Sequence, residues 1–551
     1  MSTAMAPGPM TRALGRVRNA IRPNVTVTPP PEGVNVEYDV PVPVRDGTIL
    51  RVDVYRPPGD RTSPVMMSAH PYGKGYRPKP TRRGYRPFPN LRILPQSQPF
   101  SFSAWTGWEA PDPGYWVPRG YAVVNADLRG WGTAEGTGTL LGAEEGEDYH
   151  DLIEWAAAQP WSTGQVGLNG VSYLALSQWA AAATRPPHLA AICPWEGFTD
   201  FYRDLARPGG VREDGMMLVW TKGTARTRPD SSVDLRQQQL ARPRYDEWWA
   251  ERDREIEKID VPALVCASFS DHHLHTRGSF EGFRRMASRQ KWLYTHRGPK
   301  WAVFYGEDAL AEQARFFDHF LKGEKNGQDT LPPVRLEVRE DADTVTSVRR
   351  EQHWPPDATT WQRWHLQQDG SFSDQPGSAP ATSSFRTRRG SLVHRHRFQT
   401  DTEIIGPMRL RLAIEIEGGG DVNIFAGVRK LHGGRPVAFE SAYGFRGSLV
   451  TSGMRKASHR IPDADGRPRD DVAEPLQPGQ IVQLEIELLP SSTLFRAGEV
   501  LELEIQGRWF HARNPFTGQF PAYYEKSPRG KCTVHLGAGH DSYLEVPVQA
   551  E

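Results

Sequence analysis

A serine stands at the junction of a short apolar strand and a helix in the run QVGLNGVSYLALSQWAAA, residues 165–182. The strand pattern ends at Gly170, and the helix pattern begins directly after Ser172. Such a turn exposes the serine hydroxyl, and the helix N-terminus favours developing negative charge. Gly170 removes a side chain that would clash in the turn, whereas Leu174 stands where a second glycine is usual. We therefore predict that Ser172 is a nucleophile; the alternative is a serine that caps the helix.

A nucleophilic serine on this kind of turn needs an acid and a histidine later in the chain, in that order. Asp271 follows the apolar strand PALVCASFS, and His296 follows the strand KWLYT. Both residues therefore fall at the carboxyl ends of strands, where the sites of open α/β sheets gather. We expect His296 to be the general base for Ser172 and Asp271 to hold its imidazole. The alternatives are a turn aspartate at Asp271 and a surface histidine at His296. The competing candidates for the base are His272, His273 and His275.

The oxyanion of an acyl-transfer intermediate requires two hydrogen-bond donors. One candidate is the backbone N–H of Tyr173, at the start of the helix. The other is the hydroxyl of Tyr72 in HPYGKG, the loop after the strand MMSA. A packing role for Tyr72 is equally compatible with the sequence.

Three further histidines, His272, His273 and His275, crowd the loop after Asp271. They occupy neighbouring positions that face different ways, so we predict neither a metal site nor a cofactor there. Around the catalytic residues we expect a pocket for a bulky or aromatic acyl group. Its candidate walls come from the aromatic-rich segment 75–116 and from a helical segment after residue 200: Trp105, Trp108, Tyr115, Trp116 and Trp220.

The composition of the 551 residues is that of a soluble protein with a small-molecule substrate. Lys and Arg number 67 against 66 Asp and Glu, so charge gives no reason to expect nucleic acid or an anionic membrane as partner. No stretch approaches the ~20 apolar residues of a membrane span, and the N-terminus lacks a signal-peptide pattern, so we expect a cytoplasmic protein. The sequence is compatible with a homo-oligomer.

Periodicity divides the chain into four parts. Residues 1–35 suggest a basic helix and a Pro-rich tether. Residues 36–200 and 259–325 alternate strands with helices, which predicts an α/β-hydrolase core with a mostly parallel sheet. Residues 201–258 lack core-type strands and suggest a helical cap. Residues 326–551 alternate apolar and polar positions between Gly, Pro and Asp turns, which predicts a jelly-roll β-sandwich.

Five motifs in this order resemble the CocE/NonD hydrolases, the family of cocaine esterase, α-amino-acid ester hydrolases and glutaryl-cephalosporin acylases, related to X-Pro dipeptidyl peptidases. The motifs are HPYGK (70–74), GYAVVNADLRGWGTAEG (120–136), IEWAAAQPWSTGQVGLNGVSYLA (153–175), SFSDHHLH (268–275) and RFFDHFLKG (315–323).

The resemblance covers most of the chain and implies a hydrolase core, a helical cap and a C-terminal jelly roll. It implies the nucleophile at Ser172, the acid at Asp271, the base at His296, and an oxyanion hole from Tyr72 and Tyr173. One departure is marked: the family's Gly-Pro-Trp lead into its histidine is replaced by WLYTHRGPKW.

The leading hypothesis is a serine esterase or amidase with an acyl-enzyme intermediate. An acyltransferase or lactone-forming enzyme would use the same triad, and sequence does not separate the two. A catalytically inactive binding protein is disfavoured because serine, acid and histidine are all present. X-Pro dipeptidyl-peptidase action is disfavoured because no carboxylate cluster for a free amine stands out.

Overall fold

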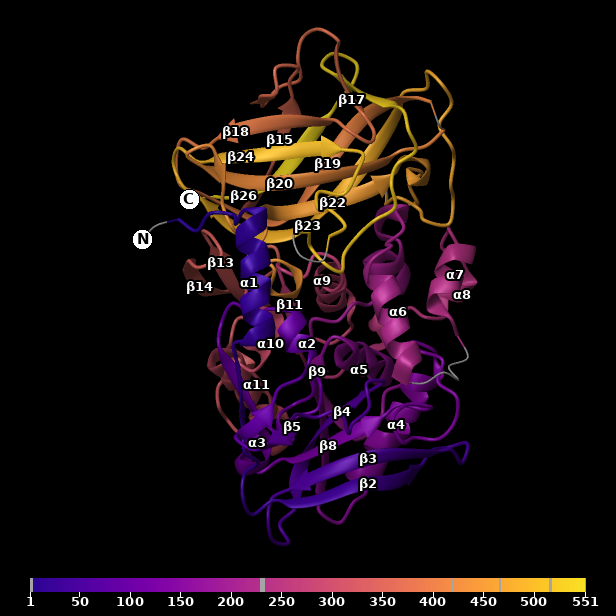
Figure 1. The fold of residues 1–551 in the computed structure, drawn as a ribbon, viewed down its shortest axis with the longest axis vertical. Helices are drawn as coiled ribbons and strands as arrows, with labels where there is room; N and C mark the ends of the chain where they lie inside the picture. The colour runs from indigo at the N-terminus through magenta and orange to yellow at the C-terminus, as the bar shows by residue number, and fades with distance from the viewer. Residues whose placement is uncertain (1–2, 228–232, 419, 465–466, 515–517, 551) are drawn as a thin grey trace.

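The computed structural model describes residues 3–227, 233–418, 420–464, 467–514 and 518–550. It has an α/β half built from the first part of the chain and an all-β half built from the last part, stacked along the long axis (Figure 1). Two hydrophobic cores correspond to these halves. In the described residues, no helix has the length and apolar character needed to cross a membrane.

A single mixed sheet forms the centre of the α/β half, with the spatial order β2-β3-β8-β4-β9-β10-β11-β12-β13-β14. The strands from β8 to β13 in this spatial order, β4 included, run parallel to one another. Antiparallel strands lie at both edges of the sheet. The bounds are β2 Asn35–Pro43, β3 Ile49–Arg56, β4 Ser63–His70, β8 Ala122–Asp127, β9 Ser162–Val171, β10 Leu189–Trp195, β11 Ala263–Ser268, β12 Lys291–His296, β13 Val334–Arg339 and β14 Val345–Glu351. The predicted α/β-hydrolase core is confirmed.

Buried helices hold this sheet in place. Helix α5 (Tyr173–Ala183) packs on α4 (Glu144–Ala157) and is tied to β4 by the Ser177 hydroxyl, which donates to the Ala69 carbonyl at 2.9 Å. Helix α11 (Glu307–Lys322) lies close against β9, since a side chain at Gly167 would meet Leu321 and Phe317 at 2.8 Å. Helix α9 (Thr276–Arg285) packs beside β11. The carboxyl ends of the parallel strands are thereby held at one edge.

The segment between β4 and β8 is ordered rather than a plain loop. It contains β5 (Lys79–Thr81), β6 (Gly84–Arg86), α2 (Asn90–Ile93), β7 (Phe100–Ser103) and α3 (Pro113–Trp116). The predicted Pro-rich tether contributes β1 (Val25–Thr28), which pairs in parallel with β7. The predicted basic helix is α1 (Pro9–Ile21), which extends from the β half toward α2 (Figure 1).

Residues 201–258 contain short helices, in line with the expected cap. They include a π-helical turn (Tyr202–Ala206), α6 (Met216–Thr227), α7 (Leu235–Ala241) and α8 (Glu247–Ala250). Arg203 of this segment forms an ion pair with Asp470 at 2.7 Å, and the Tyr245 N–H donates to the Asp470 carbonyl. The segment is therefore fastened to the β half as well as to the core.

The all-β half is a sandwich. One layer has the order β15-β26-β19-β23, with β25 and β17 beside the end of β19, and the other has the order β22-β20-β24-β18. The bounds are β15 Thr359–Leu366, β17 Ala381–Arg386, β18 Ser391–Arg397, β19 Thr402–Glu417, β20 Asn423–His432, β22 Leu449–Lys456, β23 Val482–Phe495, β24 Val500–Gln506, β25 Lys531–Leu536 and β26 Tyr543–Gln549. Alternating burial along β23 matches the predicted apolar pattern.

The central sheet continues past residue 325, where the sequence suggested the β half begins. Strand β13 pairs in parallel with β12, and β14 pairs antiparallel with β13. One pair, Arg339 with Thr493, then connects β13 to β23 of the sandwich. The two halves therefore share hydrogen-bonded backbone near this junction.

Candidate active site

Ser172 lies on a strained turn between β9 and α5. Its φ of 61° and ψ of −116° are unfavourable for a residue with a side chain, at a cost of about 1–3 kcal/mol. The Ser172 N–H donates to the Trp195 carbonyl at 3.0 Å, which fixes the turn. A Cβ at Gly170 would lie 2.5 Å from the Cβ of Leu174, so the leucine in place of the usual second glycine makes the first glycine indispensable.

His275 is the histidine that contacts this serine. Its Nε2 lies 2.9 Å from Ser172 Oγ. The residue immediately precedes α9, its backbone N–H donates to the Asp271 carbonyl, and its ring stacks on Phe198. Burial lowers the pKa of His275 well below its ordinary value, and the Lys300 charge adds to this effect. The imidazole is therefore neutral at neutral pH and can accept the serine proton.

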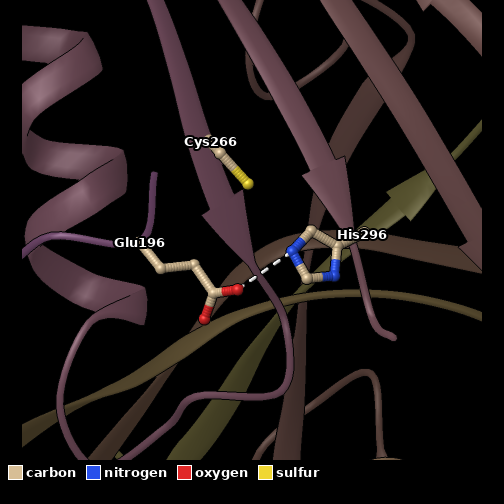
Figure 2. Close-up of side chains that lie close together, drawn as sticks. All are labelled: Glu196, Cys266 and His296. Carbon is tan, nitrogen blue, oxygen red and sulfur yellow. Dashed lines mark hydrogen bonds and ion pairs between the residues drawn. The ribbon is translucent and has the colours of Figure 1, made fainter. Parts of the chain in front are cut away.

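His296 is not brought to Ser172. Its Nδ1 accepts from the Gly298 N–H at 3.1 Å, and its Nε2 lies 3.1 Å from Glu196 Oε1, so both ring nitrogens have other partners (Figure 2). The expected Ser172–His296 pair is thus replaced by Ser172–His275. The physical reason is that the carboxylate after β10 holds the imidazole at the end of β12.

Cys266 lies beside this pair, and the ligand atoms of Glu196, Cys266 and His296 lie within 4.8 Å of one another (Figure 2). Glu196 Oε2 also accepts from the Ser268 hydroxyl at 2.9 Å. Burial raises the pKa of the Cys266 thiol well above its ordinary value. Hydrogen bonds account for the positions of Glu196 and His296.

Asp271, the expected acid, is paired with a lysine. Lys300 Nζ lies 2.5 Å from Asp271 Oδ2 and 3.9 Å from Glu196 Oε2, and all three side chains are buried. Burial raises the pKa of Asp271 despite the lysine. Burial would also raise the pKa of Glu196, but Lys300 and His296 outweigh it and lower that pKa. The His275 Nδ1 atom is buried without a hydrogen-bond partner.

A second buried carboxyl group, Glu109, lies next to the turn that carries Ser172. Its carbonyl accepts from the Val171 N–H at 3.1 Å, and its Oε1 accepts from Trp301 Nε1 at 3.0 Å. The backbone of Glu109 has a positive φ of 64°. Burial raises the pKa of Glu109 to about 8. This group is therefore mostly a neutral acid at neutral pH.

Tyr72 and Tyr173, the residues expected to form the oxyanion hole, are neighbours, with ring centroids 6.2 Å apart. Side-chain hydrogen bonds link the Tyr72 hydroxyl with Ser172 and Trp220, although burial raises the pKa of Tyr72 well above its ordinary value. Tyr173 is the first residue of α5, where backbone N–H groups have no partner within the helix. Its own hydroxyl donates to Glu145 at 2.6 Å, which anchors the side chain away from the reaction.

The loop that carries Tyr72 is fixed by the HPYGK motif. The Tyr72 N–H donates to His70 Nδ1 at 3.2 Å. Lys74 Nζ lies 3.2 Å from Asp127 Oδ2, and the Lys74 N–H also donates to that carboxylate. The motif therefore locks the loop after β4 onto the end of β8.

The structure distributes the expected pocket residues unevenly. Trp220 of α6 packs near Tyr173, with ring centroids 6.1 Å apart, and interacts with the Tyr72 hydroxyl. Phe201 contacts Trp220 and stacks on Phe198, the residue that covers His275. These aromatic side chains form an apolar wall above the serine.

The other predicted pocket tryptophans have different surroundings. Trp105 packs on Tyr55, and Trp108 packs on Trp301. Trp116 is fully buried against α11. These contacts place them in the packing around the sheet and behind the site, since large aromatic groups bury most of their surface wherever they find a core.

The fold and the serine turn define an α/β-hydrolase. Residues 46–299 match the family model of the X-Pro dipeptidyl-peptidases of family S15, and residues 326–545 match that of the X-Pro dipeptidyl-peptidase C-terminal non-catalytic domain. A CocE/NonD family hydrolase from Staphylococcus aureus is 34% identical, with a TM-score of 0.89, over 96% of this chain and 100% of that one. The chain therefore belongs to the CocE/NonD hydrolase family.

More distant relatives belong to the same class of enzyme. The cocaine esterase of Rhodococcus sp. is 23% identical over 93% of this chain and 98% of its own length. A putative serine esterase of Mycobacterium bovis is 25% identical over 85% of this chain and 89% of its own length. The protein is accordingly a hydrolase.

From the sequence, His275 is only a competing candidate for the base, because strand order favours the histidine at a strand end. One signal in the sequence speaks against His296: the family's Gly-Pro-Trp lead is missing there. That signal does not reveal the contact between Glu196 and His296, because it joins residues 100 positions apart.

We predict that His275→Gln lowers turnover by on the order of 10⁴–10⁶, since it removes the base that contacts Ser172. His296→Gln keeps a donor for Glu196 and should retain most turnover per folded molecule, with a lower melting temperature. Steady-state kinetics on an activated ester, normalised to the folded fraction by circular dichroism, separates the two. Loss of turnover in His296→Gln with His275→Gln active would reverse the assignment.

We also predict that the acidic limb of kcat/KM lies below pH 6.5, the ordinary histidine value. Activity requires neutral His275, and its lowered pKa keeps it neutral to lower pH than an exposed imidazole. A pH–rate profile of kcat/KM measures this pKa for the free enzyme. An acidic limb at or above pH 7 would contradict the assignment.

Proposed function

We propose that this protein is a serine hydrolase that cleaves an ester or amide bond through an acyl-enzyme, with Ser172 as nucleophile and His275 as general base. The observation that carries the proposal is the 2.9 Å contact between Ser172 Oγ and His275 Nε2 on a strained strand-to-helix turn. A hydroxyl in this geometry loses its proton to the imidazole as it attacks a carbonyl carbon.

The proton transfers of the acylation step take place between the substrate, Ser172 and His275. Ser172 Oγ bonds to the carbonyl carbon while its proton passes to His275 Nε2. The carbonyl oxygen becomes an oxyanion, which the Tyr72 hydroxyl and the Tyr173 N–H stabilise. The C–O or C–N bond then breaks, and His275 returns the proton to the leaving alcohol or amine. Water repeats the sequence to release the acid.

The imidazolium formed in this step needs negative charge nearby. Asp271 and Glu196 are two carboxylates against one Lys300, and Glu109 is mostly neutral at neutral pH. Lys300 forms ion pairs with Asp271 and Glu196, which limits the repulsion of the imidazolium by the lysine. We assign Asp271 a positioning and electrostatic role, since its carbonyl holds the His275 backbone and its carboxylate holds Lys300.

The substrate class follows from the wall over the serine. Phe198 stacks on His275, Phe201 stacks on Phe198, and Trp220 packs against Phe201 near Tyr72. We propose that residues 201–258 act as a cap and that the acyl group of the substrate is bulky and apolar. Such a group buries against the rings and displaces water from the reaction.

We predict that Ser172→Ala lowers turnover by a factor on the order of 10⁴–10⁶ while the fold is retained. The same change should abolish covalent labelling by a fluorophosphonate. Ser177→Ala, a control on the next turn of α5, should keep both. Intact-mass spectrometry after labelling reports the adduct directly. A fluorophosphonate adduct on the Ser172→Ala protein, or wild-type turnover, would exclude Ser172 as nucleophile.

We predict that Tyr72→Phe lowers kcat by about 10²–10³ with little change in melting temperature, because phenylalanine keeps the ring and removes the oxyanion donor. Tyr76→Phe is the matched control, since Tyr76 lies on the same loop and packs on Phe88. Kinetics and thermal melts of the two variants measure both effects. An unchanged kcat in Tyr72→Phe would leave the second donor to a backbone amide of this loop.

A further inference from the structure

A cavity of about 640 Å³ separates α1 from the β half, away from Ser172. Its wall carries a group of cations, Arg12, Arg16, Arg18, Arg22 and Arg446, together with His511. Among the described residues that line it, none is an aspartate or a glutamate. Three of these arginines lie on α1 and Arg22 caps its C-terminal end, so one helix supplies most of the positive charge along the described wall of the cavity.

Arg16 is held by contacts on two sides. Its Nη2 donates to the Gly518 carbonyl at 2.5 Å, and its guanidinium lies 4.1 Å from the centre of the Phe445 ring. Its Nη1 is buried without a hydrogen-bond partner. The planar group is thus fixed in position with one edge unsatisfied, and a buried unsatisfied charged donor costs free energy.

Electrostatics adds to this cost. Burial lowers the pKa of Arg16 to about 10, and Arg12 adds to the effect. Burial also lowers the pKa of Arg12. Arg446, on the opposite wall, forms ion pairs with Asp343 and Glu440. On the α1 side, the charge of Arg12 acts on Arg16.

We propose that this cavity is a binding site for a small oxyanion, a phosphoryl or carboxylate group, held by the guanidinium fork of Arg16 with support from Arg12. Arginine matches two oxygens of such a group through parallel N–H donors. The bound anion would satisfy the Arg16 donor and neutralise the repulsion between the two arginines.

The site adjoins the catalytic loop. Gln519 lines the cavity, and its side chain hydrogen-bonds to His273, two residues before His275. The cavity wall also joins α1 to residues 95–97 and 444–447. An anion there would bind three separate chain segments together and stabilise the folded protein by mass action.

Isothermal titration calorimetry of the full-length protein with inorganic phosphate, and separately with citrate, tests the proposal. A titration with sodium chloride at equal ionic strength is the reference. We expect saturable one-site binding, a rise in melting temperature, and a Kd for phosphate at least about tenfold weaker in Arg16→Gln. Arg389→Gln, an exposed arginine with the same charge change, is the control and should bind like the wild type. Arg16→Lys keeps the charge but lacks the fork, so it should also bind more weakly.

Equal binding by Arg16→Gln and Arg389→Gln, or absence of binding by folded wild-type protein at millimolar phosphate, would overturn the site. Kinetics on an ester that carries a carboxylate, with a neutral ester as control, identifies the source of the anion. A KM that rises with phosphate indicates an anionic group on the substrate, whereas an unchanged KM indicates a separate ligand. The Ser172→Ala protein should bind phosphate normally, so failure of the proposed hydrolysis does not affect this test.

Discussion

The buried ammonium of Lys300 organises the catalytic end of the sheet. It lies between Asp271 after β11 and Glu196 after β10, and it is itself the first residue of the short helix α10 (Lys300–Phe304) after β12. Removing one member of such a buried group costs about 3–5 kcal/mol because the remaining charges are left uncompensated. Three neighbouring strand ends are thus held by one cation.

This arrangement decides which histidine meets the nucleophile. Asp271 is occupied by the lysine, and Glu196 holds His296 inside the sheet. The loop between β11 and α9 then presents His275 to Ser172. The strained backbone of Ser172 completes the geometry, since the hydrogen bond to Trp195 keeps the hydroxyl pointed out of the turn.

Sequence was sufficient for the elements whose signals are local. The strand–turn–helix at Ser172, the parallel sheet and the alternating strands after residue 402 all follow from periodicity within short windows. The family resemblance extended this to the whole chain, and the comparisons confirm it.

Long-range electrostatics was not predictable in the same way. Which carboxylate pairs with which cation depends on side chains from different strand ends, and a sequence window does not contain that information. Strand-end position favoured His296, but Glu196 follows β10 with a positive φ that no pattern marks. The tryptophans were similarly ambiguous, because an aromatic residue suits either a core or a pocket; Trp220 lies over the site, whereas Trp116 fills the core.

The structure of the protein after reaction with a fluorophosphonate tests the central claim most directly. The account predicts phosphorus on Ser172 Oγ, the phosphoryl oxygen between the Tyr72 hydroxyl and the Tyr173 N–H, and His275 Nε2 as the nearest imidazole nitrogen. His296 should remain bound to Glu196. An adduct on another residue, or His296 turned toward the phosphonyl group with His275 displaced, would contradict it.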